Sequence, residues 1–289
     1  MDVAKPCRLC QLSDLPLRES HDLPAGLYRI AGSQSDNPNP VLVSASIAIS
    51  TSKQVTAPLL CERCEKRFDQ GGEDWILKNC WRDEQTFPLR DNLLAAGAVQ
   101  ADEIAVFEAA KIAAVDAPKI SYFAASIFWR GAAHRWTIQQ KPADPLPFGP
   151  YTESFRTYLL GGKWPERAAL LVFVGAGMEQ FRNVTVALPH RRFREAGFRL
   201  YAFTIPGVTF FLFLGGGIPF GIQHHCCASS PEAYVLMSDQ TDMANAQVNI
   251  KLFETTRKVG SLAKKTADPS VVPSPWPAEE VLKLIRKRG

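Results

Sequence analysis

Two short cysteine pairs constrain this chain more than any other feature. Cys7 and Cys10 form one C-x-x-C turn, and Cys61 and Cys64 form a second one. Each turn presents two thiolates from one tight bend, and two such turns complete a tetrahedral shell around a zinc ion. The pattern therefore predicts one structural zinc ion that joins two segments separated by 50 residues.

The spacing of the two pairs leaves other interpretations open. A gap of 50 residues exceeds the roughly 15–20 residues of a zinc ribbon. Four unpaired core cysteines, or two vicinal redox pairs, would give the same sequence. Apolar residues alternate with a second series of side chains over residues 41–50, which predicts a strand. A hairpin inserted between the two turns would explain the long gap and favours zinc.

The distribution of charge and apolar residues predicts a protein of the cytoplasm. The first residues of the chain lack an apolar signal segment, and cysteines used as metal ligands are typical of a reducing compartment. Residues 201–222 carry no charge and equal a membrane span in length. Pro206 and Gly207 divide them into short runs rich in Phe, Thr and Val, which favours a buried β-hairpin over a membrane segment.

The remaining patterns predict an α+β fold. A helix is expected over residues 64–81, interrupted at Gly71 and Gly72, and residues 92–140 are Ala-rich and helical in pattern. Beyond a Pro-rich connector, the expected elements are a helix at 152–160, strands at 168–175, 184–188, 198–205 and 208–214, a polar tail at 261–276 and an amphipathic helix at 278–288. We expect three parts: residues 1–90, an α+β domain at 91–260, and a linker with a terminal helix at 261–289.

The segments around the cysteines also carry a family resemblance. The motifs are Cys-x-x-Cys at 7–10, Ser-His-x-x-Pro at 20–24 and Leu-Cys-x-x-Cys-Glu at 60–65. In this order they resemble the zinc-containing branch of the HNH (ββα-metal) endonuclease superfamily, over about residues 5–80. They also resemble uncharacterised bacterial proteins that continue into a helix with a Trp-Arg pair, here Trp129 and Arg130. The resemblance implies a treble-clef, or ββα, zinc module followed by a helical segment and a mainly antiparallel β-sheet domain.

The resemblance also implies catalytic roles. In active members, one Mg²⁺ or Mn²⁺ ion distinct from the zinc stabilises the leaving oxygen, and a histidine deprotonates water. By position, His21 would be this general base and Glu65 would bind the catalytic metal. Ser20 stands where an acidic ligand is expected, and Thr56 stands near the place of an orienting asparagine.

Because of these departures, the sequence is compatible with two functions and with two interpretations of His21. One function is that of an HNH-like metal-dependent DNA endonuclease or a diverged relative. The alternative is a non-catalytic, zinc-stabilised module that binds nucleic acid or protein, and an enzyme site within residues 90–289 also stays open. His21 is equally interpreted as a buried histidine bonded to a backbone carbonyl. Asp22, Glu73 and Asp74 are candidates for the acidic ligand that Ser20 does not supply.

Two further clusters lie in the second half of the chain. Arg191, Arg192 and Arg194 surround an aromatic residue in an expected loop and predict a contact to nucleic acid, although a solvated loop has the same composition. This placement agrees with the charge, since residues 1–90 hold 11 Lys/Arg and 12 Asp/Glu whereas the whole chain carries +4. Residues 224–227 read His-His-Cys-Cys, and a strand there would give at most two ligands on one face, which favours packing over a metal site.

Overall fold

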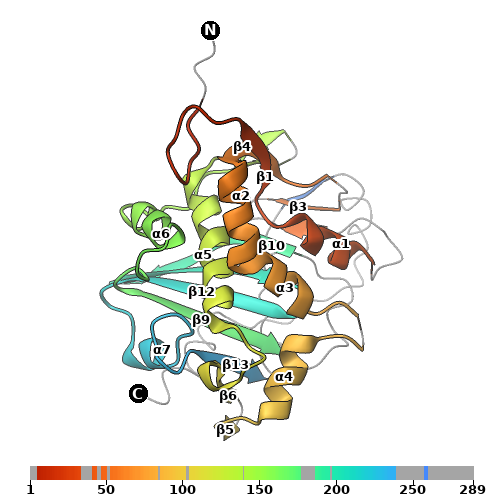
Figure 1. Cartoon of the computed structure of the whole chain (residues 1–289), viewed down its shortest axis with the longest axis vertical. Helices are drawn as coiled ribbons and strands as arrows, with labels where there is room; N and C mark the ends of the chain where they lie inside the picture. Colours follow the sequence, from red (N-terminus) through yellow and green to blue (C-terminus); the bar gives the residue numbers. More distant parts are fainter. Residues whose placement is uncertain are drawn as a thin grey trace.

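The fold is α+β, with helices on a large mixed sheet. A computed structural model describes residues 5–33, 41–43, 47–50, 53–83, 85–101, 104–138, 140–176, 186–195, 197–238 and 257–259. Figure 1 shows α5 running across the sheet, with α2 and α3 beside it and the N-terminal segment beyond the end of α2. The expected α+β class with a mainly antiparallel sheet is confirmed.

Ten strands form the main sheet in the order β14-β3-β2-β10-β11-β12-β9-β13-β6-β5. Three neighbouring pairs are parallel, β14 with β3, β2 with β10 and β9 with β13, and the others are antiparallel. Their bounds are β2 Val41–Val43, β3 Ile47–Ser50, β5 Gln100–Ala101, β6 Ala105–Glu108, β9 Ala168–Gly175, β10 Val186–Glu195, β11 Phe198–Ile205, β12 Val208–Gly215, β13 Tyr234–Ser238 and β14 Arg257–Val259. The central strands β9, β11 and β12 are buried on both faces.

The uncharged segment forms the hairpin that the sequence predicts. β11 pairs with β12 in full register from Phe198 and Gly215 to Ile205 and Val208, around the turn at Pro206 and Gly207. Gly207 has a φ of 76°, in the left-handed region that favours glycine. Among the described helices, none combines the length and the apolar character that crossing a bilayer requires.

The helix α5 covers one face of the sheet. It spans Ala117–Ala133, and its N-cap Asp116 accepts a hydrogen bond from the Lys119 backbone N–H. Phe128 meets Phe203 of β11 at 4.9 Å between ring centroids, and Phe203 stacks on Phe210 of β12 at 4.6 Å. Burying a Phe side chain contributes about 1.5–3 kcal/mol, so this aromatic layer fixes α5 on the sheet.

A second, small sheet carries the cysteine segments. β1 (Leu17–His21) pairs antiparallel with β4 (Thr56–Cys61), and the helix α2 (Glu62–Phe68) follows β4 directly. One turn of π-helix, η1 (Asp69–Glu73), leads into α3 (Asp74–Asn79). A Cβ atom at Gly72 of this turn would strike the backbone of Lys119 in α5. The helix expected at 64–81 is therefore present, and its glycine interruption allows a close approach to α5.

The remaining elements complete the same core. They are α1 Ala25–Ser33, α4 Pro88–Ala96, the 3₁₀ turn η2 Ala109–Lys111, α6 Tyr151–Leu159, α7 Phe220–His224 and the short strands β7 Thr137–Ile138 and β8 Lys141–Pro142. A single hydrophobic cluster runs from Cys7 to Met237, and β2 and β3 join the main sheet. The first 90 residues thus share a core with the rest, and the domain boundaries stay predictions.

Several expected elements differ in the structure. Residues 41–50 form the hairpin β2–β3 instead of one strand, with residues 44–46 outside the described part. The Ala-rich stretch at 92–140 contains the strands β5 and β6, because β6 pairs with β13 at the sheet edge. The expected basic loop belongs to β10, which extends to Glu195 by pairing with β11. Residues 184–185, the tail at 261–276 and the helix at 278–288 lie outside the described residues.

Candidate metal centre

The four cysteines converge as the sequence predicts. One Sγ atom from each of Cys7, Cys10, Cys61 and Cys64 lies within 4.8 Å of all the others. Sγ of Cys10 and Sγ of Cys61 are 3.8 Å apart. Tetrahedral zinc with Zn–S bonds of about 2.3 Å requires sulfur atoms roughly 3.8 Å apart. The cluster can therefore hold a metal ion such as zinc.

Local backbone structure positions each thiol. The first turn closes through a bond from the Gln11 N–H to the Cys7 carbonyl, at 2.8 Å, and the Arg8 N–H donates to the Leu59 carbonyl of β4 at 3.0 Å. Cys61 ends β4 and is the N-cap of α2, which places Cys64 on its first turn. The two thiol pairs thus meet at the point where β4 becomes α2.

The electrostatics of the cluster favour a bound cation. A hydrogen bond with Cys64 lowers the pKa of Cys7 to about 4, and the same bond raises the pKa of Cys64. Burial raises the pKa of Cys61. One thiolate is therefore stabilised by a thiol that stays protonated and by backbone N–H groups, among them that of Cys61 at 3.3 Å. A bound divalent ion would stabilise all four thiolates together, so that no thiol has to stay protonated.

Next to the cluster, β1 and α2 bring two predicted site residues into contact. The Ser20 hydroxyl donates to a carboxylate oxygen of Glu65 and accepts a hydrogen bond of 3.1 Å from the Leu60 N–H. Ser20 is fully buried, whereas Glu65 is partly exposed. His21 is the last residue of β1, partly exposed, and it pairs in register with Thr56. The junction of β1 and α2 therefore carries a hydroxyl and a carboxylate, with an imidazole on the next residue.

A catalytic divalent ion finds few ligands at this junction. Across the described part of the chain, the four cysteines are the only group of three or more His, Cys, Asp or Glu residues close enough to bind one ion. Asp22 and Glu73, which the sequence offers as substitutes for an acidic ligand, are buried, and Asp74 is exposed. The contact of Ser20 with Glu65 supplies one hydroxyl and one carboxylate at this junction.

A buried ion pair connects this region with α5. Nη2 of Arg130 lies 2.6 Å from Oε1 of Glu73, and the Arg130 guanidinium lies over the Phe68 ring at 4.6 Å. Arg130, from the Trp-Arg pair that the resemblance includes, therefore has a packing and salt-bridge role. Its partner Glu73 is far away in the sequence, and no motif links the two residues.

Burial is the main cause of the raised pKa values of two acidic groups around Arg130. Desolvation raises the pKa of Glu73, and the nearby Arg130 charge opposes this effect. Desolvation likewise raises the pKa of Asp22 to about 7, again opposed by Arg130. Oδ1 of Asp22 and the Nε and Nη1 atoms of Arg130 are buried and find no hydrogen-bond partner among the described residues. A buried polar atom without a hydrogen-bond partner lowers the stability of the fold. The packing of the surrounding core therefore holds this network in place.

The other two predicted clusters lie at the end of α7 and on β10. His224 ends α7, and residues 225–227 follow it in a turn instead of forming a strand. Cys226 lies close to the Gln223 carbonyl and to Ser229, and Cys227 accepts a hydrogen bond from Ser121. Arg191, Arg192 and Arg194 lie on β10, and their side chains are outside the described part, so a nucleic-acid contact there stays a prediction.

Comparison with family models, with curated proteins and with solved structures gave no match. The chemistry of the site therefore has to be argued from its own geometry.

Proposed function

We propose that Cys7, Cys10, Cys61 and Cys64 bind a structural zinc ion that closes an HNH-like ββα module. The closed four-thiol shell supports this role, because structural zinc sites use all four positions for protein ligands. The order of turn, strand β1, strand β4 and helix α2 is the order that the resemblance implies.

We further propose that the module is an HNH-like metal-dependent DNA endonuclease or a diverged relative. One observation carries the proposal, the contact between Ser20 of β1 and Glu65 of α2, with His21 as the next residue of β1. Glu65 would hold one Mg²⁺ or Mn²⁺ ion together with water, and the ion would supply charge stabilisation for the leaving oxygen when it is bound. Substrate phosphates would complete its shell.

In this proposal His21 accepts a proton from the attacking water. An imidazole is suited to this role near neutral pH, provided that it lies within hydrogen-bond reach of the water. The partial exposure of His21 leaves it accessible to solvent. Ser20 positions the Glu65 carboxylate through their hydrogen bond and is itself held by the Leu60 N–H.

The charges on α2 support a phosphodiester substrate. Arg63, Lys66 and Arg67 are exposed on the helix that carries Glu65. Lys and Arg contacts to phosphates supply most of the sequence-independent affinity for DNA.

A cleavage assay on plasmid DNA with Mg²⁺ or Mn²⁺ tests the proposal. We expect His21→Ala and Glu65→Gln to abolish cleavage, with losses of about 100-fold or more for a general base. Matched controls are His224→Ala, on the exposed face of α7, and Glu62→Gln, one turn before Glu65 on α2. Cleavage that persists in His21→Ala but is lost in Glu62→Gln would contradict the assigned roles.

The second candidate is a non-catalytic module that binds nucleic acid. It is favoured by the burial of Ser20, whose hydroxyl already has two hydrogen-bond partners. A gel-shift series separates the two functions. Binding that weakens steeply with salt, without turnover in either metal, supports the second candidate.

A further inference from the structure

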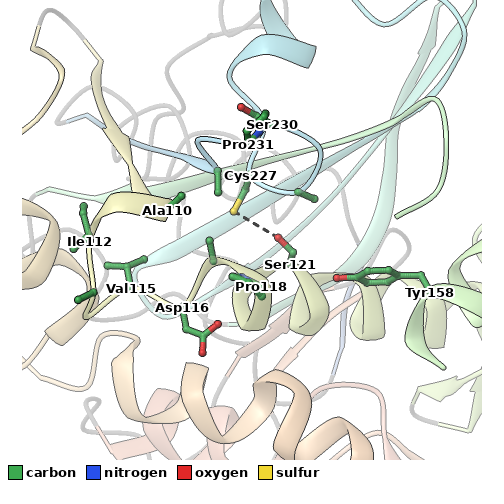
Figure 2. A pocket seen from close by; sticks show the side chains of 14 residues that line it. Ala110, Ile112, Val115, Asp116, Pro118, Ser121, Tyr158, Cys227, Ser230 and Pro231 are labelled. Carbon is green, nitrogen blue, oxygen red and sulfur yellow. Dashed lines mark hydrogen bonds between the residues drawn. The ribbon is translucent and has the colours of Figure 1, made fainter. Parts of the chain in front are cut away.

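A pocket opens at the N-terminal end of α5, away from the cysteine cluster. Its volume is about 610 Å³, within the range of small-molecule sites. Figure 2 shows that its walls come from the turn before α5, from the first turns of α5, from α6 and from the loop that follows α7. Three segments far apart in the sequence, residues 110–121, Tyr158 and residues 227–233, thus build one cavity.

Three polar groups face the cavity from different walls. Ser121 of α5 donates a hydrogen bond of 3.6 Å to the sulfur of Cys227. The sulfhydryl of Cys227 and the oxygen of Ser121 keep capacity for a further bond. Tyr158 of α6 reaches the cavity from the side, with its hydroxyl directed toward the start of α5 (Figure 2). Its ring packs on Tyr122 and Trp164, which fixes its position.

The charges around the cavity exclude an ionic ligand. Within the described structure, fourteen side chains line the cavity, and none of them is positively charged. The one carboxylate, Asp116, caps α5 through the Lys119 N–H at 3.0 Å and lies 3.4 Å from the Lys119 ammonium group. The positive end of the helix dipole is therefore already neutralised. A second anion would be repelled, and a cation would compete with Lys119.

The Cys227 thiol at the centre is a neutral polar group and not a nucleophile. Burial raises the pKa of Cys227 to about 12, so the thiol stays protonated at neutral pH. A reactive cysteine requires the thiolate. The apolar residues around it are mostly alanine, valine, isoleucine and proline.

From this combination we infer that the cavity binds a neutral small molecule with an apolar ring or chain and one hydroxyl or carbonyl oxygen. The oxygen lies among Ser121, Tyr158 and Cys227, and the apolar body fills the alanine-lined part. This site is independent of the function proposed for the cysteine module.

Binding of three naphthalene probes of one shape tests the inference on the full chain. The probes are 2-naphthalenemethanol, 2-naphthoate and 2-naphthylmethylammonium, and ligand-observed NMR gives each dissociation constant. We expect the alcohol to bind at least about tenfold more tightly than either ion, a difference of about 1.4 kcal/mol. Binding of none of the three at millimolar concentration, or tighter binding of naphthoate, would overturn the inference.

Two adjacent exposed alanines provide a matched pair of variants. Ala113 lines the cavity, whereas Ala114 is exposed beside it and does not line it. We expect Ala113→Trp to weaken binding of the alcohol about tenfold or more, and Ala114→Trp to change it less than about twofold. Equal binding in both variants would place the probe elsewhere and contradict the site.

The variant Tyr158→Phe keeps the ring and removes only the hydroxyl. We expect it to weaken binding of the alcohol about threefold to tenfold, the cost of one neutral hydrogen bond, and to leave binding of unsubstituted naphthalene unchanged. An equal loss for both probes would argue against a polar contact at Tyr158. Circular dichroism spectra that match the parent chain verify that each variant is folded.

Discussion

Replacing Arg130 by methionine isolates the energy of the buried ion pair between α5 and η1. The side chain of Arg130 is 1% exposed and that of Glu73 is 8% exposed. Removing one partner of a buried pair costs about 3–5 kcal/mol, because the remaining charge has no counterion. Two nitrogens of Arg130 lack hydrogen-bond partners within the described part of the chain, and their removal offsets part of this cost. We therefore expect a loss of about 3 kcal/mol in the free energy of unfolding.

An exposed pair with the same contact distance provides the control. Arg135 and Asp144 also approach to 2.6 Å, but their side chains are 61% and 87% exposed. Exposed pairs contribute about 0–1 kcal/mol, so Arg135→Met is expected to cost less than about 1 kcal/mol. Urea denaturation followed by circular dichroism measures both variants, with equal m-values as the condition for comparing them.

The pH dependence of the variant gives an independent readout. Burial already raises the pKa of Glu73, and loss of Arg130 removes the charge that opposes this rise. A carboxyl group with a raised pKa in the folded state stabilises the fold below its unfolded pKa and loses that contribution as pH rises. The loss in the free energy of unfolding caused by Arg130→Met should therefore be larger at pH 8 than at pH 5.

A double variant completes the cycle. With Glu73→Leu added, the Glu73 carboxylate is no longer buried without its partner, and we expect part of the stability to return relative to Arg130→Met alone. The reasoning is refuted if Arg130→Met costs no more than Arg135→Met, or if its deficit shrinks as pH rises.

Three further predictions concern other parts of the fold. Gly207→Ala should lower the free energy of unfolding by about 2 kcal/mol, because φ is positive there and a Cβ atom would lie 2.6 Å from the Phe87 ring. Urea denaturation measures this loss, and an unchanged free energy of unfolding would contradict the turn. Asp116→Ala should cost about 1 kcal/mol through loss of the α5 cap, and an unchanged urea midpoint would argue against this cap. Metal chelation should lower the melting temperature by about 10 °C or more, since metal binding is coupled to folding; a melting curve indifferent to chelator would contradict a structural metal.

The sequence predicted those features that depend on local chemistry. Each cysteine turn is local and predicts two thiols at one point. The meeting of the two turns then follows if both bind one metal ion. The long apolar runs of β9, β11 and β12 predicted strands, and Pro206 with Gly207 predicted the turn between the last two. The contact of Ser20 with Glu65 follows from the pairing of β1 with β4.

Features that depend on tertiary pairing were missed. The basic residues of β10 were expected in a loop, but pairing with β11 extends the strand through them. β6 lies in an Ala-rich stretch whose composition favours helix, and β13 supplies the hydrogen bonds that make it a strand. The cavity of Ser121, Tyr158 and Cys227 joins segments whose proximity no local pattern encodes.

X-ray absorption at the zinc edge, on protein purified without chelators, tests the central claim most directly. The account predicts one zinc ion per chain with about four sulfur neighbours at about 2.3 Å. A chain without zinc, or a zinc shell dominated by nitrogen and oxygen, would contradict a closed site formed by Cys7, Cys10, Cys61 and Cys64.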